Sequence, residues 1–357
     1  VGGRKNMIIN GAMNVAQRGS ILITDAGGEY TLDRFQAYWR GGALATATQD
    51  TDVPAGQGFS YSIKMDVTTG DALGTGSDLV LFRQKIEAQD LQHLEYGHAN
   101  AKTMTLTFWI KSTVTGTYIL RASQADANDR INSTAYTVSS ANTWEKKTIT
   151  IAGDTSGVID NNTGNGLELA WCFGSGSDFN SGTRSDNTWI AWDATKQFQG
   201  QVNAVNSASN NIYITGVQLE VGDTATDFEH RSYGEELALC QRYYEIVADA
   251  SQSSDNTIHY VCGGFSTKSD QVNWNYFFQV VKRGTFTLEA TTGTDYYKAR
   301  NHTDFIVDTA VGMTADYQGL NCVNGYISGS YSGSTEGKAW QFTLNNANAK
   351  IAVSAEL

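Results

Sequence analysis

Apolar and polar residues alternate along most of the segment 103–111. Met104, Leu106, Phe108 and Ile110 occupy one parity, and the residues between them are mostly threonine. Because successive side chains of a β-strand point to opposite faces, this period of two predicts a strand with one buried and one wet face. The same alternation marks further candidate strands at 61–67, 116–123, 146–153 and 167–173.

The run 79–82 is apolar at every position, which is typical of a central strand covered on both faces. Glycine-rich turns separate the short candidate strands, and no βαβ rhythm occurs. The pattern predicts an all-β chain with an N-terminal jelly-roll β-sandwich, a short connecting helix and a smaller C-terminal β-sandwich.

The alternation changes phase within 212–221. Ile212 and Ile214 have even numbers, whereas Val217, Leu219 and Val221 have odd ones, and Gly216 lies between the two sets. A β-bulge at this glycine would keep both sets on the core face.

Residues 231–248 carry the helical pattern. Ser232 or Gly234 can cap the helix, and the apolar stripe follows at spacings of three and four. This stripe comprises Leu237, Cys240, Tyr244 and Val247. Two interpretations remain open: a helical connector packed between two domains, or a helix that also meets its copies around a symmetry axis. In the second interpretation these four residues form the oligomer interface.

Strand patterns resume after Asp249, with five clear candidates and two weaker ones. The domain prediction is therefore a jelly roll over 1–230, a helical connector over 231–248 and a β-sandwich tip over 249–357.

Charge narrows the choice of partners. The formal net charge is −12, and no run of Lys and Arg occurs, which disfavours nucleic acid. No window resembles a membrane span, so no membrane insertion is expected.

Catalytic and cofactor motifs do not stand out. The four cysteines are far apart, the five histidines are scattered, and no nucleophile elbow or phosphate loop occurs. We therefore expect no catalytic residue, no metal ligand, no cofactor and no enzyme activity. The segments 126–132 and 160–166 offer oxygens for a structural Ca²⁺, although both are also ordinary turn sequences.

Five motifs occur in order over about the first 245 residues: RKNMIINGAMNVAQRGS, YTLDRFQAYW, LTFWIKS, NTWEKKTITIAGDTSG and ITGVQLEVGDTATDFEHRSYGEELALCQRYY. Together they resemble the tail-fibre-like proteins of tailed phages and prophages, whose N-terminal part is similar to a carbohydrate-binding module. Asp227 stands where such proteins tend to carry a proline, and beyond Asn256 only the last residues match.

The resemblance implies a fibre of the phage virion, assembled in the host bacterial cytoplasm. It implies a homo-oligomer, with a trimer expected, that binds a host-surface glycan and other phage tail proteins. Two alternatives stay open: a structural tail or baseplate-collar protein that binds no glycan, and a polysaccharide depolymerase.

Aromatic residues in polar segments are the candidates for glycan contact, because sugars stack on flat rings. In the C-terminal part these are Tyr296, Tyr297, His302, Tyr317 and Tyr331. In the jelly roll they are Trp189 and Trp192, which lie on a long polar connection. Packing within or between protomers is the alternative role for these two tryptophans.

Overall fold

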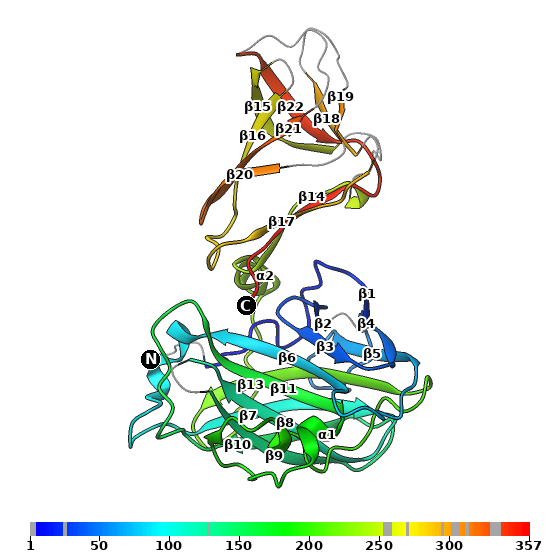
Figure 1. Cartoon of the computed structure of the whole chain (residues 1–357), viewed down its shortest axis with the longest axis vertical. Helices are drawn as coiled ribbons and strands as arrows, with labels where there is room; N and C mark the ends of the chain where they lie inside the picture. The colour runs from blue at the N-terminus through cyan, green and yellow to red at the C-terminus, as the bar shows by residue number, and fades with distance from the viewer. Residues whose placement is uncertain are drawn as a thin grey trace. The chain divides into compact units, whose positions relative to one another are not determined.

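The computed structural model describes residues 5–23, 27–126, 129–252, 259–268, 271–293, 296–300, 308–310, 314–328 and 337–357. Nearly all regular structure in this part of the chain is β, which confirms the predicted fold class. The chain divides into two compact units, residues 1–236 with Leu357 and residues 237–356 (Figure 1). No helix in the described ranges is long and apolar enough to cross a membrane.

Two antiparallel sheets form the first unit. Sheet A has the order β1 (Ile21–Ile23), β4 (Leu44–Asp50), β5 (Ser62–Thr69), β13 (Asn211–Val221), β7 (Met104–Ser112) and β10 (Glu145–Ile151). Sheet B has the order β12 (Ile190–Ala191), β9 (Arg130–Val138), β8 (Gly116–Gln124), β11 (Asn165–Ser175), β6 (Leu79–Glu87), β3 (Gln36–Arg40) and β2 (Gly27–Tyr30). Short helical turns lie between strands at η1 (Ala88–Leu94), α1 (Ser177–Asn180) and η2 (Ala194–Lys196).

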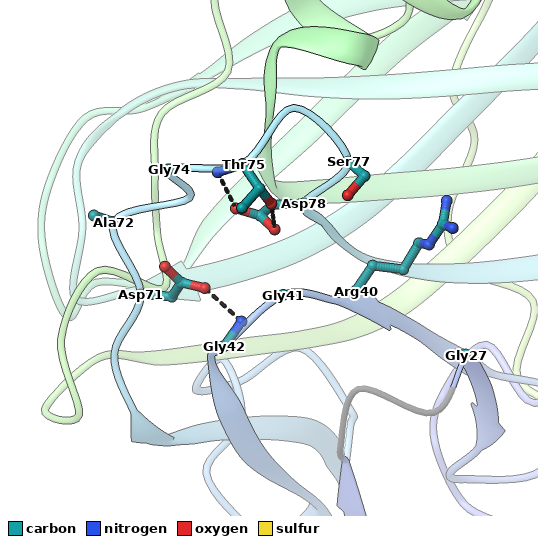
Figure 2. A pocket seen from close by; sticks show the side chains of 10 residues that line it. All are labelled: Gly27, Arg40, Gly41, Gly42, Asp71, Ala72, Gly74, Thr75, Ser77 and Asp78. Atoms are coloured by element: carbon teal, nitrogen blue, oxygen red, sulfur yellow. Dashed lines mark hydrogen bonds between the residues drawn. The ribbon is translucent and has the colours of Figure 1, made fainter.

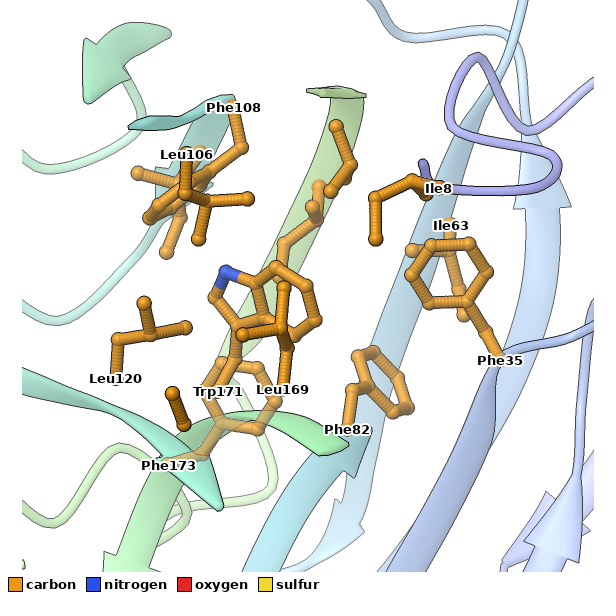
Figure 3. Close-up of a cluster of buried hydrophobic side chains, with 14 of the residues drawn as sticks. Ile8, Phe35, Ile63, Phe82, Leu106, Phe108, Leu120, Leu169, Trp171 and Phe173 are labelled. Atoms are coloured by element: carbon orange, nitrogen blue, oxygen red, sulfur yellow. The ribbon is translucent and has the colours of Figure 1, made fainter. Parts of the chain in front are cut away.

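The inward side chains of the two sheets form one core (Figure 3). Phe108 of sheet A meets Trp171 of sheet B edge to face, with ring centroids 5.8 Å apart, and Phe82 meets Phe173 at 5.4 Å. Such contacts add to the free energy of burying the rings themselves. The alternation seen in the sequence therefore selects the core of a β-sandwich.

Two finer predictions about strands are confirmed. The outward side chains Leu79 and Leu81 of β6 are buried, as expected for a strand covered on both faces. The register of β13 shifts between Thr215 and Gln218, and Gly216 has a φ of 62°. Ile214 and Val217 are both buried because this bulge absorbs the change of phase.

The second unit has a small sheet and a large one. Sheet C has the order β14 (Tyr244–Asp249), β23 (Lys350–Ser354) and β17 (Thr287–Ala290). Sheet D has the order β19 (Asp308–Ala310), β18 (Tyr297–Arg300), β22 (Ala339–Leu344), β15 (His259–Lys268), β16 (Gln271–Phe277), β21 (Cys322–Ser328) and β20 (Thr314–Gly319). A short turn, η3 (Ala250–Gln252), follows β14. Trp274, Tyr297, Trp340 and Phe342 belong to the buried core of this unit.

The helix prediction for 231–248 is wrong in its second half. Helix α2 covers Tyr233–Gln241, and Tyr244 begins strand β14, which pairs with β23. The sequence Tyr-Tyr-Glu-Ile-Val consists largely of aromatic and β-branched residues, which favour strands when a partner strand is present. The Nζ atom of Lys282 donates to the carbonyl of Gln241 and so satisfies the helix end.

Candidate functional site

The outward face of sheet B carries polar side chains in one row. Register places Gln36 of β3 opposite Arg83 of β6, and Ala170 of β11 opposite both Arg83 and Arg121 of β8. Because neighbouring strands are about 4.8 Å apart, the two arginines are about 10 Å apart across the small Ala170. Glu168 lies two residues along β11 and can reach both.

Glu168 binds both arginines. Arg83 Nη1 lies 3.2 Å from Glu168 Oε2, and Arg121 Nη2 donates to Glu168 Oε1. Gln36 accepts from Arg83 Nε at 2.6 Å, and Gln197 accepts from Arg121 Nη1. We call these five residues the Glu168 network.

Arg121 and Glu168 are 4% and 5% exposed, so the centre of the network has lost most of its water. Burial lowers the pKa of the Arg121 guanidinium, whereas the adjacent Glu168 carboxylate acts against that shift. Guanidinium stays protonated in proteins, so the pair remains ionic. Removing one partner of such a buried pair leaves an uncompensated charge, which costs about 3–5 kcal/mol.

Two aromatic rings flank the network. The Arg121 guanidinium carbon lies 5.4 Å from the ring centroid of Trp192, and that of Arg83 lies 4.7 Å from the ring centroid of Tyr38. Both are cation–π distances, so the arginines hold the rings in place. Trp192 is 45% exposed and Tyr38 is partly exposed.

The segment 176–200 supplies Trp192 and Gln197 and folds back on sheet B. Phe198 and Phe179 pack on the outward apolar side chains of β6, β8 and β11. Phe198 N donates to Phe179 O at 2.9 Å, and Trp192 N donates to Asp129 O at 2.9 Å. These bonds fix the backbone that carries the exposed indole.

A pocket of about 760 Å³ lies at the far end of β3 (Figure 2). Asp71 accepts from Gly42 N at 2.6 Å and Asp78 accepts from Thr75 N at 2.9 Å, so both carboxylates hold the pocket's own loops. Arg40 extends along the pocket wall and is exposed. Since Arg40 shares the outward parity of β3 with Tyr38, the pocket continues the face that carries the Glu168 network.

The segments considered for Ca²⁺ do approach each other, because Asp160 N donates to Asp126 Oδ2 at 3.1 Å. Burial raises the pKa of Asp126, and the hydrogen bond from Asp160 N works against this. Within the described ranges, no group of three or more His, Cys, Asp or Glu residues could hold a metal ion.

The structure separates the two candidate tryptophans. Trp192 is exposed beside the Glu168 network, whereas Trp189 is only 8% exposed. The indole N–H of Trp189 donates to Ala152 O at 2.6 Å, and its ring packs against Tyr96 with centroids 5.8 Å apart. Trp189 is thus a core residue, and its assignment to glycan contact is wrong because a sugar cannot reach the ring.

Tyr297 is also wrongly assigned. It is 0% exposed, its hydroxyl donates to Thr291 O at 2.5 Å, and its ring stacks on Phe342. Tyr296 is partly exposed and stays a candidate. His302 and Tyr331 lie outside the described residues. The backbone of Tyr317 belongs to β20 and pairs with Asn324, but the structure does not describe its side chain.

The four residues expected at an oligomer interface differ in exposure. Cys240 and Tyr244 are buried within the single chain, at 0% and 3% exposure. Leu237 and Val247 are partly exposed and so retain surface that another chain could cover. The oligomer interface stays a prediction.

Sequence reasoning missed the Glu168 network. Its signal was a lone charged residue in each of three apolar strand segments: Arg83 in LVLFRQ, Arg121 in YILRAS and Glu168 in LELAWCF. A charge in such a context indicates an outward position with a partner on a neighbouring strand.

No protein-family model matches the chain, and no curated protein matches it. Among solved structures, it is similar to the enzymatically active domain of tailspike protein 4 of bacteriophage CBA120, with 17% identity and a TM-score of 0.33. That match covers 61% of this chain and 21% of the tailspike, so the chain spans about a fifth of the tailspike's length.

Several carbohydrate-binding modules give similar scores. The family 11 module of a cellulosomal cellulase of Clostridium thermocellum has 12% identity and a TM-score of 0.29, covering 60% of this chain and 98% of the module. The module TmCBM61 in complex with β-1,4-galactotriose has 12% identity and a TM-score of 0.29, covering 61% and 100%. TM-scores this low carry no conclusion about what this chain binds.

Proposed function

We propose that the first unit binds a glycan without cleaving it, at the Glu168 network and its two flanking rings. The observation that carries the proposal is an exposed indole, Trp192, that lies over a buried arginine, Arg121, which is ion-paired with Glu168 on the outward face of sheet B. A sugar ring offers an apolar face for stacking, and its hydroxyls both donate and accept hydrogen bonds.

The chemistry of the network matches such a ligand. Arg83 is the partly exposed member of the network, and its planar guanidinium can bind neighbouring hydroxyls in pairs. The other four side chains are at most 9% exposed and support this surface from below. The five side chains are already paired with one another and held by the segment 176–200, so binding would cost little side-chain entropy. The partly exposed Tyr38 and the pocket beside Arg40 extend the same face, which favours an extended chain of sugars over a single one.

In its finer form, the proposal is a phage tail-fibre component that attaches the virion to a host-surface glycan. The five ordered motifs in the first 245 residues support this role. It implies a homo-oligomer in the virion, in which weak sites repeated around an axis gain affinity from multivalency.

The test is a glycan array and host-cell adsorption with the full chain, comparing the wild type with Trp192→Ala. Loss of the stacking ring should weaken binding about tenfold, since burying an aromatic ring contributes about 1.5 kcal/mol or more. Tyr233→Ala is the control, because Tyr233 is 59% exposed and lies on α2. Unchanged binding by Trp192→Ala would overturn the site assignment.

The same preparation separates the alternatives. A structural collar protein would bind neither cells nor isolated polysaccharide. A depolymerase would release reducing ends from capsule or lipopolysaccharide, and we expect none.

A further inference from the structure

The outward face of sheet D exposes aromatic rings in the middle of the sheet. Phe265 and Tyr260 of β15 are 54% and 56% exposed, whereas Ser266, which follows Phe265, is buried. Strand β15 lies between β22 and β16, and at Gly264 and Phe265 its backbone pairs with both neighbours. A ligand of this face must therefore be recognised by side chains, since strand addition needs a free edge.

Amides separate the rings. Register aligns Phe265 of β15 with Asn273 of β16 and Tyr326 of β21, which makes a row of ring, amide and ring. The Thr267 hydroxyl donates to Asn273 Oδ1 at 3.0 Å and fixes the plane of that amide. The exposed Asn275 and Asn324 form the next row. Amides donate and accept at once, so they can pair with hydroxyl groups.

Glycine keeps part of this face flat. A Cβ atom placed on Gly263 would lie 3.8 Å from the hydroxyl of Tyr260, so the tyrosine extends along bare backbone. Gly263 pairs with Gln341 of β22, which pairs with Arg300 of β18. The face therefore passes from rings and amides to a cationic margin formed by Lys298 and Arg300.

The charge of this face is opposite to that of the chain. The strands β15, β16, β18, β21 and β22 contain no Asp or Glu, although the chain has 37 acidic residues and a net charge of −12. The charged side chains in these strands are Lys268, Lys298 and Arg300, and the sheet's Asp308 and Asp316 belong to the edge strands β19 and β20. Such a surface attracts an anion.

We propose that this ring face of sheet D, comprising Tyr260, Phe265, Asn273, Lys298, Arg300 and Tyr326, binds an acidic polysaccharide. The rings would stack on sugar units, the amides would bind hydroxyls, and the two cations would pair with carboxylate or phosphate groups. A second copy of the chain fits less well, because a protein interface would bury Asn273, Asn275 and Gln341 and require a partner for each amide. This site is separate from the Glu168 network and does not depend on it.

The experiment measures affinity of the full chain for polygalacturonate, for a phosphomannan and for neutral dextran. The wild type should prefer an acidic polymer, and binding should weaken from about 50 to 500 mM NaCl as charges are screened. The polymer that binds identifies carboxylate or phosphate as the acid group. Phe265→Ala should lower the affinity about tenfold, and Lys298→Gln with Arg300→Gln should flatten the salt dependence.

Val281→Ala is the control, because Val281 is an exposed apolar residue of the second unit, at 49% exposure, that lies outside the strands of sheet D. All these proteins carry Trp192→Ala as well, so that the glycan site proposed in the first unit does not contribute to the binding that is measured. Equal affinity for all three polymers, or normal binding by Phe265→Ala, would overturn the proposal. A lower molar mass of Phe265→Ala in light scattering, with normal polymer binding, would show that the face covers a second copy.

Discussion

At the scale of single residues, the second unit contains a lysine without access to solvent. Lys282 and Glu245 have side chains 0% exposed, and Lys282 Nζ lies 2.5 Å from Glu245 Oε2. Tyr276 and the backbone N–H of Gln279 both donate to the other oxygen of Glu245. Burial lowers the pKa of Lys282, and the hydrogen bond to Glu245 opposes this only in part.

The lowered pKa of Lys282 predicts that the stability of the second unit depends on pH. Since the folded pKa of Lys282 is below the ordinary 10.5, the unfolded chain binds the proton more tightly between the two values. The free energy of unfolding of the second unit should therefore rise with pH as the pH approaches 10.5. Urea unfolding, followed by tryptophan fluorescence from about pH 8 to 10, measures the slope.

The control for this slope removes both charges. Lys282→Met with Glu245→Leu replaces the pair by apolar side chains, which is often neutral for stability. The free energy of unfolding of the wild type, relative to that of this variant, should increase as the pH rises. Parallel curves for the two proteins would contradict the assignment.

The candidate site shows what sequence can say about single residues. Trp189 and Trp192 look alike in the sequence, yet one is in the core and the other stands in solvent. Their exposure depends on the path of the segment 176–200 over sheet B, which no local pattern encodes. The prediction for Tyr297 is wrong for the same reason, because a polar neighbourhood in the sequence does not prevent a ring from entering the core.

At the scale of elements, strand β13 depends on its glycine. Gly216 has a positive φ, and a Cβ atom there would lie 2.6 Å from Cζ of Phe59 and 3.0 Å from Trp109. Only a residue without a side chain fits this bulge without strain.

Gly216→Ala should lower the free energy of unfolding of the first unit by about 2 kcal/mol or more, from left-handed backbone strain and from crowding. Gly200→Ala is the control, because Gly200 also has a positive φ but has no atom within 4 Å of the Cβ position. It should cost about 1 kcal/mol. If both variants lose the same free energy of unfolding in urea, the side chains of Phe59 and Trp109 move aside at little cost.

The helix shows the limit of periodicity. A spacing of three and four fits Leu237, Cys240, Tyr244 and Val247. Tyr244 is nevertheless a buried residue of strand β14 and not of a helix. The helix ends at Gln241, and β23, more than a hundred residues later, offers β14 a partner. Short apolar runs remain ambiguous between helix and strand until such a partner is known.

At the scale of the whole molecule, the predicted oligomer can be tested at the residues that keep exposed surface. Leu237→Lys with Val247→Lys should reduce the molar mass in light scattering, because a charge in an apolar interface is costly to bury. Leu22→Lys is the control, since Leu22 is 61% exposed in the first unit. A molar mass unchanged by the double substitution would remove this interface from consideration.

The sequence by itself determined the all-β class, the positions of many strands and the bulge at Gly216, because the alternation of side chains along a strand is a local property. Tertiary structure alone decided which outward side chains remain exposed and which are covered. Arg121 and Glu168 are 47 residues apart, and Phe265 aligns with Tyr326 across an intervening strand. Both proposed sites depend on which strands lie next to each other in a sheet. The alternation of side chains within a single strand does not encode that order.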